Sequence, residues 1–264
     1  MAHRVRLDAL LTERGLFPSR ARAAAAVLAG EVRLGTDGRR AAKPGQLVDP
    51  GLALAVDERP RYVSRGAHKL LAALDALGVE VAGRCAVDVG ASTGGFTHVL
   101  LERGAAHVVA LDVAYGELDW GLRNDPRVTV LERTNARALR PEDLPYAPDL
   151  VVADVSFISL RKVLPAVLGC AAPRFDALVM VKPQFELGRE RVGRGGVVRD
   201  PAERRAALLE VAEAARALGT TVLGFAPSGL PGPKGNRETF AWLAEAGRPG
   251  GVDDLTAALA EVDV

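Results

Sequence analysis

One glycine-rich segment has the residue types and spacing of a ligand-binding turn. It runs from Cys85 to Phe96 and places its glycines directly after an apolar run and before a helical stretch, where they let the backbone approach a ligand closely. Asp88 stands two residues before the first glycine, where it suits a carboxylate that orders the turn or binds an amine, because it would repel a pyrophosphate. No Lys-Ser or Lys-Thr pair follows the glycines, so the segment is not a P-loop.

A second carboxylate, Asp112, ends the next apolar run, where it can accept hydrogen bonds from both ribose hydroxyls of a nucleoside. Together with the acidic residue before the glycines, this placement favours an S-adenosylmethionine site over an NAD site. The NAD site, and a tight connection without any ligand, are the alternatives for such a turn.

Two more charged residues directly follow apolar runs. Asp154 comes after one run, and Lys182, whose ammonium is costly to bury unless it is paired, comes after the next. Because strand ends meet at the ligand-binding edge of an α/β sheet, we expect Asp154 and Lys182 to meet there. A functional pair is favoured, and a purely structural ion pair is the alternative.

Alternating apolar and helical stretches must position these residues. Strand-like runs cover residues 84–89, 107–113, 128–131, 150–153, 177–181 and 221–226, and helical stretches cover residues 96–103, 160–170 and 202–218. Repeated units of this kind predict an α/β fold with a mostly parallel, Rossmann-like sheet that is covered on both faces. Residues 240–243 predict a last strand, for which an antiparallel orientation is one option.

The N-terminal part of the chain reads as a small α+β module. Leucines at helical spacing predict a first helix, and Ser19 suits the N-cap of a second helix through an alanine run. Residues 1–69 carry a net charge of +6 and the remaining residues −5. The basic module is therefore the candidate for binding a polyanion, with scattered solvated arginines as the alternative.

Composition excludes several classes of protein. The chain has 264 residues, 48% of them hydrophobic, and a formal net charge of +1, which is typical of globular proteins. Two cysteines cannot build a disulfide scaffold, and no apolar run approaches the roughly 18 residues of a membrane-spanning helix. We expect a cytoplasmic protein that does not enter the membrane. The histidines lack ligand-like spacing, so no metal is expected.

Six motifs in one order resemble the TlyA family, which is also known as haemolysin A. They are residues 63–70, 88–97, 154–159, 181–186, 195–200 and 230–236. Lys69, Asp154, Lys182 and Glu238 resemble the Lys-Asp-Lys-Glu tetrad of FtsJ-like ribose methyltransferases. Two departures stand out: His98 replaces an expected acidic residue, and the N-terminal hairpin carries extra arginines.

The resemblance implies the organisation and the activity. It implies an S4 RNA-binding domain over residues 1–59, a linker over residues 60–66 and an FtsJ-like methyltransferase domain over residues 67–264. The activity would be S-adenosylmethionine-dependent 2′-O-methylation of cytidine in 16S or 23S ribosomal RNA, or in both. Lys182 would act as general base or oxyanion stabiliser, while Asp154 and Glu238 would orient Lys182 and Lys69. The partner would be ribosomal RNA in ribosomal subunits, and the protein a monomer.

The resemblance also implies two sets of binding residues. The expected cofactor-binding residues are Asp88, Gly90, Ala91, Ser92, Thr93, Gly94, Gly95, Phe96, Asp112, Val113, Asn135, Ala136 and Asp154. The expected RNA-binding residues are Arg4, Arg6, Arg14, Arg20, Arg22, Lys43, Arg65, Arg189 and Arg194. For Asn135 and Ala136 a simple turn is an alternative, and for the basic loop over residues 188–199 a mobile surface loop is the alternative to closure over RNA.

Two functions from other classes compete with the enzyme. The family's second name suggests a membrane-lytic protein, but no segment has an apolar face in excess of what a core needs. A catalytically silent RNA-binding assembly factor would have the same fold and basic surface, and the intact tetrad argues against it.

Overall fold

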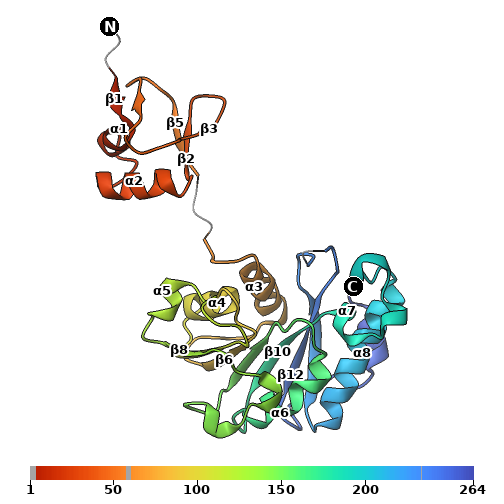
Figure 1. The fold of residues 1–264 in the computed structure, drawn as a ribbon. Coiled ribbons are helices and arrows are strands. Elements are labelled where there is room, and N and C mark those ends of the chain that lie inside the picture. The colour runs from red at the N-terminus through yellow and green to blue at the C-terminus, as the bar shows by residue number, and fades with distance from the viewer. Residues whose placement is uncertain (1–3, 58–60, 233) are drawn as a thin grey trace. The chain divides into compact units, whose positions relative to one another are not determined.

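The computed structural model describes residues 4–57, 61–232 and 234–264, and the chain divides into two compact units, residues 1–61 and 62–264 (Figure 1). The expected linker begins at residue 60, which lies outside the described residues, and its residues 62–66 belong to the second unit. Among the described residues, no helix is both long and apolar enough to span a bilayer.

The first unit packs two helices against short strands. Its elements are β1 (Val5–Arg6), α1 (Leu7–Glu13), α2 (Arg20–Leu28), β2 (Val32–Leu34), β3 (Arg39–Arg40), β4 (Leu47–Val48) and β5 (Leu54–Val56). Strands β3, β2 and β5 form an antiparallel sheet, and β1 pairs with β4. The side chain of Ser19 accepts a hydrogen bond from the backbone N–H of Arg22, which confirms the predicted N-cap of α2.

A seven-stranded sheet forms the centre of the second unit. Its strands are β6 (Cys85–Val89), β7 (His107–Leu111), β8 (Val128–Leu131), β9 (Leu150–Ala153), β10 (Asp176–Val181), β11 (Thr221–Pro227) and β12 (Thr239–Ala244). Their order is β11-β12-β10-β9-β6-β7-β8, and β12 is antiparallel to both of its neighbours whereas the other pairs are parallel. The predicted α/β class with a mostly parallel sheet is confirmed, and the last strand takes the antiparallel option.

Helices cover both faces of this sheet (Figure 1). They are α3 (Gly66–Leu77), α4 (Gly95–Glu102), α5 (Trp120–Arg123), α6 (Leu164–Gly169), α7 (Pro183–Glu186), α8 (Pro201–Ala217) and α9 (Leu255–Ala260). Alternate strand residues face opposite cores: Val108 packs in the core with α3 and α4, and Val109 in the core with α6, α8 and α9. This alternation follows from the period of two in a strand.

The helix expected over residues 160–170 is interrupted. The chain forms a 3₁₀ turn, Leu160–Lys162, and α6 then begins at Leu164. Pro165 lies in the first turn of α6, where its missing N–H costs nothing, whereas its ring would clash with the carbonyl of a preceding helical turn. The proline therefore separates the two segments, and the sequence interpretation of one helix was wrong here.

Candidate functional site

The glycine-rich turn joins β6 to α4 and passes close to the end of β9. Gly90 has a φ of +88° and Gly94 a φ of +96°, in the region that favours glycine. A Cβ atom on Gly90 would lie 2.6 Å from the backbone oxygen of Asp154, and one on Gly94 would meet the side chains of Leu118 and Leu122. Both positions therefore require glycine.

Asp88 lies behind this turn and is fully buried. Its Oδ2 accepts hydrogen bonds from the backbone N–H of Thr97 at 2.8 Å and from the Thr97 hydroxyl at 2.7 Å, in the first turn of α4. Burial raises the pKa of the Asp88 carboxyl to about 7, although the hydrogen bonds from Thr97 act in the opposite direction. These contacts match a carboxylate that orders the turn.

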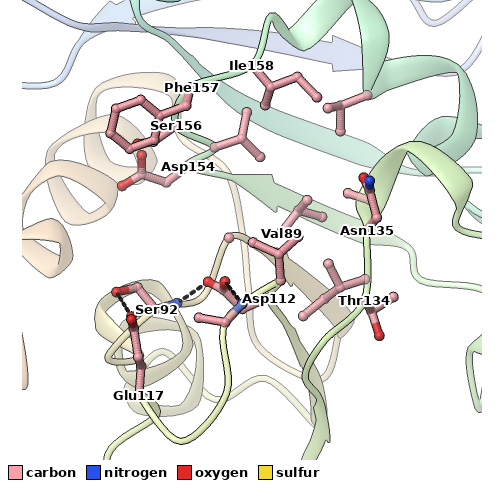
Figure 2. Close-up of a pocket in the computed structure, with 17 residues that line it drawn as sticks. Val89, Ser92, Asp112, Glu117, Thr134, Asn135, Asp154, Ser156, Phe157 and Ile158 are labelled. Carbon is pink, nitrogen blue, oxygen red and sulfur yellow. Dashed lines mark hydrogen bonds between the residues drawn. The ribbon is translucent and has the colours of Figure 1, made fainter.

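A first cavity of about 460 Å³ opens beside the turn (Figure 2). Asp112 lies on one side of it. Its Oδ2 accepts a hydrogen bond from the backbone N–H of Ser92, and its Oδ1 accepts one from that of Ala114, each at 2.8 Å. Ser92 also donates its hydroxyl hydrogen to Glu117 at 3.1 Å. The remaining lining is mostly apolar: Val89, Leu111, Val113, Ala136, Val155, Phe157, Ile158 and Val163, with Gly90, Thr134, Asn135, Asp154 and Ser156 between them. A flat, partly polar molecule such as a nucleoside suits this lining.

A second cavity of about 450 Å³ shares Gly90, Ser92, Asp154 and Ser156 with the first. Two lysines and two carboxylates line it, and each comes from a different part of the fold. Lys69 lies on α3, Asp154 follows β9, Lys182 follows β10 and Glu238 precedes β12. The sheet thus brings together the four side chains that resemble the tetrad.

These four charges form two ion pairs with little exposure. Lys69 Nζ donates to Glu238 Oε2, and the side chains are 8% and 2% exposed. Lys182 Nζ lies 2.5 Å from Asp154 Oδ1, an ion pair without hydrogen-bond geometry, and donates a hydrogen bond to Ser156 Oγ at 2.8 Å. The expected meeting of Asp154 and Lys182 is therefore confirmed. Each ammonium faces a carboxylate, so the attraction within each pair offsets part of the cost of removing these charges from water.

A third cavity of about 330 Å³ opens from the same charged cluster. Lys182 and Glu238 lie at its boundary with the second cavity, because each of them lines both cavities. Its other lining residues are Ser156, Phe157, Gln184, Phe185, Val192, Gly196, Gly232, Lys234 and Asn236. The rings of Phe157 and Phe185 lie 5.2 Å apart between centroids, and Phe157 is 92% exposed. This cavity offers aromatic surface to a second ligand.

Most of the predicted cofactor-binding residues line the first or the second cavity. Asp88 and Gly94 do not line the three cavities described above, and both act on the shape of the turn instead. Asn135 caps a 3₁₀ turn (Ala136–Ala138) and also lines the first cavity, so the turn and the lining role coexist. Sequence reasoning did not single out Ser64, Ser156 and Phe157, although they lie within the motifs over residues 63–70 and 154–159, and that membership was the available signal.

The predicted RNA-binding residues differ in their surroundings. Arg6 and Arg20 both contact the buried Asp8, at 2.7 and 3.4 Å, and Arg14 donates to the backbone oxygens of Pro50 and Leu52. Arg4, Arg22 and Lys43 in the first unit and Arg189 in the loop after α7 are exposed. Arg65 donates to the backbone oxygen of Pro231 at 3.2 Å, and the side chain of Arg194 lies outside the described residues.

Among the residues that the structure describes, no group of three or more His, Cys, Asp or Glu side chains is placed to hold a metal ion.

Comparison with known families finds two matches that together cover most of the chain. The S4 domain matches residues 5–54, and the FtsJ-like methyltransferase matches residues 62–245.

Individual proteins match over nearly the full length. The chain is 57% identical over 245 residues to the 16S/23S rRNA (cytidine-2′-O)-methyltransferase TlyA of Mycobacterium tuberculosis, covering 92% of this chain and 91% of that protein. It is 34% identical over 238 residues to Hemolysin A of Brachyspira hyodysenteriae, covering 90% and 98%. A solved protein of Streptococcus thermophilus, provisionally named a hemolysin, has a TM-score of 0.72 and 37% identity and covers 98% of this chain and 96% of its own.

Proposed function

The chain belongs to the TlyA family, which joins an S4 domain to an FtsJ-like methyltransferase, and we propose that it methylates the ribose 2′-hydroxyl of cytidine in ribosomal RNA. The observation that carries this proposal is the charge-balanced cluster of Lys69, Asp154, Lys182 and Glu238 in one cavity beside the glycine turn. The relative with 57% identity is named for the same reaction.

The first two cavities fit S-adenosylmethionine. The bare Cα of Gly90 lets the turn lie directly against the backbone of Asp154, and both residues line the two cavities. Asp112 presents a carboxylate at the end of β7, where ribose hydroxyls can donate to it, and Ala136 and Ile158 offer apolar walls to a purine. When bound, the cofactor supplies a methyl group on a positively charged sulfur, which the carboxylates of Asp112, Glu117 and Asp154 along the first cavity accommodate.

The charged cluster supplies what a ribose hydroxyl lacks. A hydroxyl is a weak nucleophile at neutral pH, so it needs a group that accepts its proton or stabilises its developing negative charge. Lys182 lies between the second and third cavities, where donor and acceptor meet, and as an ammonium it would stabilise the negative charge that develops on the hydroxyl oxygen, while the hydroxyl proton leaves to water. Asp154 holds the Lys182 ammonium from one side, and Ser156 accepts its hydrogen bond.

Lys69 and Glu238 form the second half of the cluster. Glu238 is buried against the Lys69 ammonium and reaches both the second and the third cavity. This buried ion pair would hold one positive and one negative charge beside the reacting hydroxyl. Because both side chains are enclosed, they would keep the reacting atoms in line. Positioning of this kind accounts for much of the acceleration in group transfer between two bound molecules.

The third cavity suits the base of the acceptor nucleotide. Phe157 and Phe185 offer ring faces on which an unstacked base can pack, which is a common mode of RNA recognition. Lys234 lies at the same cavity and is exposed, so it is available to a phosphate. The exposed basic residues of the S4 unit would hold the flanking RNA.

Methyl transfer to purified ribosomal subunits tests the proposal. With methyl-labelled S-adenosylmethionine, the label is expected on the ribose of cytidine in one or both ribosomal RNAs, and nuclease digestion maps its position. Label on bases alone, or on no RNA, refutes the proposed reaction. Cofactor binding without transfer to either subunit would instead support an RNA-binding assembly factor.

A further inference from the structure

We propose that Glu186 is a positioning residue for the methyl acceptor, because its buried carboxylate joins the segment over residues 156–160 to the end of α7. The inference rests on the proposed function, since it concerns the walls of the third cavity. Those walls come from separate segments: Phe157 follows β9, Phe185 lies on α7 and Val192 lies in the loop before α8. Contacts between these segments must therefore hold the walls in place relative to one another.

Glu186 contacts the first of these segments through both of its oxygens. Oε1 accepts the backbone N–H of Leu160 at 2.8 Å, and Oε2 accepts the hydroxyl of Ser159 at 2.5 Å. The residue is 4% exposed, and burial raises the pKa of its carboxyl above the usual range. A buried carboxylate is expensive unless its partners are fixed, so these contacts limit where residues 156–160 can lie.

Arg161 extends the connection to α8. Its Nη2 donates to the backbone oxygen of Glu186 at 2.7 Å, and its Nη1 lies 3.1 Å from Oε2 of Glu210. The other oxygen of Glu210 accepts Nη1 of Arg191 at 2.8 Å, and Arg191 also donates from Nε to Glu203 at 2.6 Å. Glu210 therefore bridges an arginine from the 3₁₀ turn before α6 and an arginine from the loop after α7.

Asn236 completes the enclosure on the far side of this loop. Its side chain is buried, accepts the N–H of Val198 at 2.9 Å and donates to the oxygen of Gly196 at 2.8 Å. The segment before β12 is thus joined to the loop after α7, which Arg191 joins to α8. Every wall of the third cavity is connected to another by a polar contact, and Glu186 is the most buried acid in this chain of contacts.

Glu186→Gln and Glu210→Gln test the inference in the full-length protein. The glutamine at position 186 keeps the volume but turns one acceptor into a donor facing Ser159. We expect kcat/KM for ribosomal subunits to fall roughly 10- to 100-fold in E186Q, because small misplacements of a bound reactant have effects of this size. E210Q should lower it by a smaller factor. Because Ile158 of the same segment also lines the first cavity, the Kd for S-adenosylmethionine should rise in E186Q, but by a smaller factor than that by which kcat/KM falls.

Glu213→Gln is the matched control, since Glu213 lies on the same helix and is exposed. E213Q should leave both kcat/KM for ribosomal subunits and the Kd for S-adenosylmethionine unchanged. Hydrogen exchange of the peptide over residues 156–161 gives a readout that does not depend on catalysis, and E186Q should exchange faster there. If the wild-type protein methylates no ribose, the proposed function is refuted. Hydrogen exchange over residues 156–161 and RNA affinity would then still test whether Glu186 holds this segment in place.

Three results would overturn the inference. The first is unchanged RNA kinetics in a folded E186Q variant. The second is an equal loss of cofactor and RNA affinity, which means a general structural role. The third is unchanged hydrogen exchange over residues 156–161.

Discussion

Lys182 Nζ and Asp154 Oδ1 lie 2.5 Å apart although the two residues belong to different β-α units. Each is the first residue after its strand, and β9 and β10 are parallel neighbours, with Ala153 opposite Val179. The contact is therefore a product of the sheet topology. It places one cation and one anion at the edge where ligands bind in α/β folds.

Replacement of Lys182 by Met should abolish methyl transfer while leaving cofactor binding nearly intact. The ammonium is the proposed group that assists the hydroxyl, and such groups contribute typically 10²- to 10⁴-fold. Single-turnover rates with saturating RNA measure the loss, and calorimetry measures the Kd for S-adenosylmethionine. A K182M variant as fast as wild type would remove Lys182 from the mechanism.

Removal of one partner from the Lys69–Glu238 pair should destabilise the protein. Lys69→Met leaves the Glu238 carboxylate buried at 2% exposure without its cation, and a broken buried pair costs about 3–5 kcal/mol. The double variant K69M with Glu238→Leu should recover most of that stability in urea unfolding, yet it should transfer no methyl groups. A double variant as unstable as K69M would show that packing, not charge, dominates there.

Gly90→Ala should weaken cofactor binding beyond its effect on stability. The added Cβ would lie 2.6 Å from the backbone oxygen of Asp154, so the turn and the end of β9 must separate. Gly78 supplies the control, because its φ is +67° and nothing lies within 4 Å of an added Cβ. G78A should cost only the left-handed penalty of about 1–2 kcal/mol with an unchanged cofactor Kd. Equal cofactor affinities in the two variants would contradict this reasoning.

Asp88 should make stability depend on pH. Its pKa is about 7 in the folded protein, against an ordinary value of 3.8 in the unfolded chain, so the folded state holds the proton more tightly. Stability from this group is present at low pH and is lost as the pH rises through 7.

Asp88→Asn should remove that dependence. Between about pH 5 and pH 8, the free energy of unfolding of wild type should fall by about 2–3 kcal/mol relative to D88N. Chemical denaturation at both pH values measures the difference. Parallel behaviour of the two proteins would mean that Asp88 stays ionised throughout.

Strand ends were the part of the site that could be predicted from residue patterns. Asp112, Asp154 and Lys182 each follow an apolar run, and the strands end one residue before them. The period and apolarity of the runs sufficed because parallel strands are buried on both faces. Residues 107–113 were expected as one strand, whereas β7 ends at Leu111 and Val113 is 67% exposed at the cavity.

The burial of Lys69 and Glu238 could not be predicted from their surroundings in the sequence. One lies on α3 and the other precedes β12, so their contact depends on tertiary packing, and charged side chains are usually exposed. Only the family resemblance indicated them. The position of Phe157, with a φ of +63°, was equally inaccessible because no local pattern demands that conformation.

Under the proposed function, the antiparallel strand β12 fixes Glu238 of the charged cluster independently of the residues before it that would contact RNA. Thr239 pairs with Val181 on one side and with Pro227 on the other, so two neighbouring strands fix the position of Glu238, directly before it. The segment between β11 and β12, described over residues 228–232 and 234–238, places Gly232 and Lys234 at the third cavity, but its length does not set that register. Insertions at its tip can therefore alter which RNA is accepted without moving the acid, so target choice can diverge while the reaction is kept.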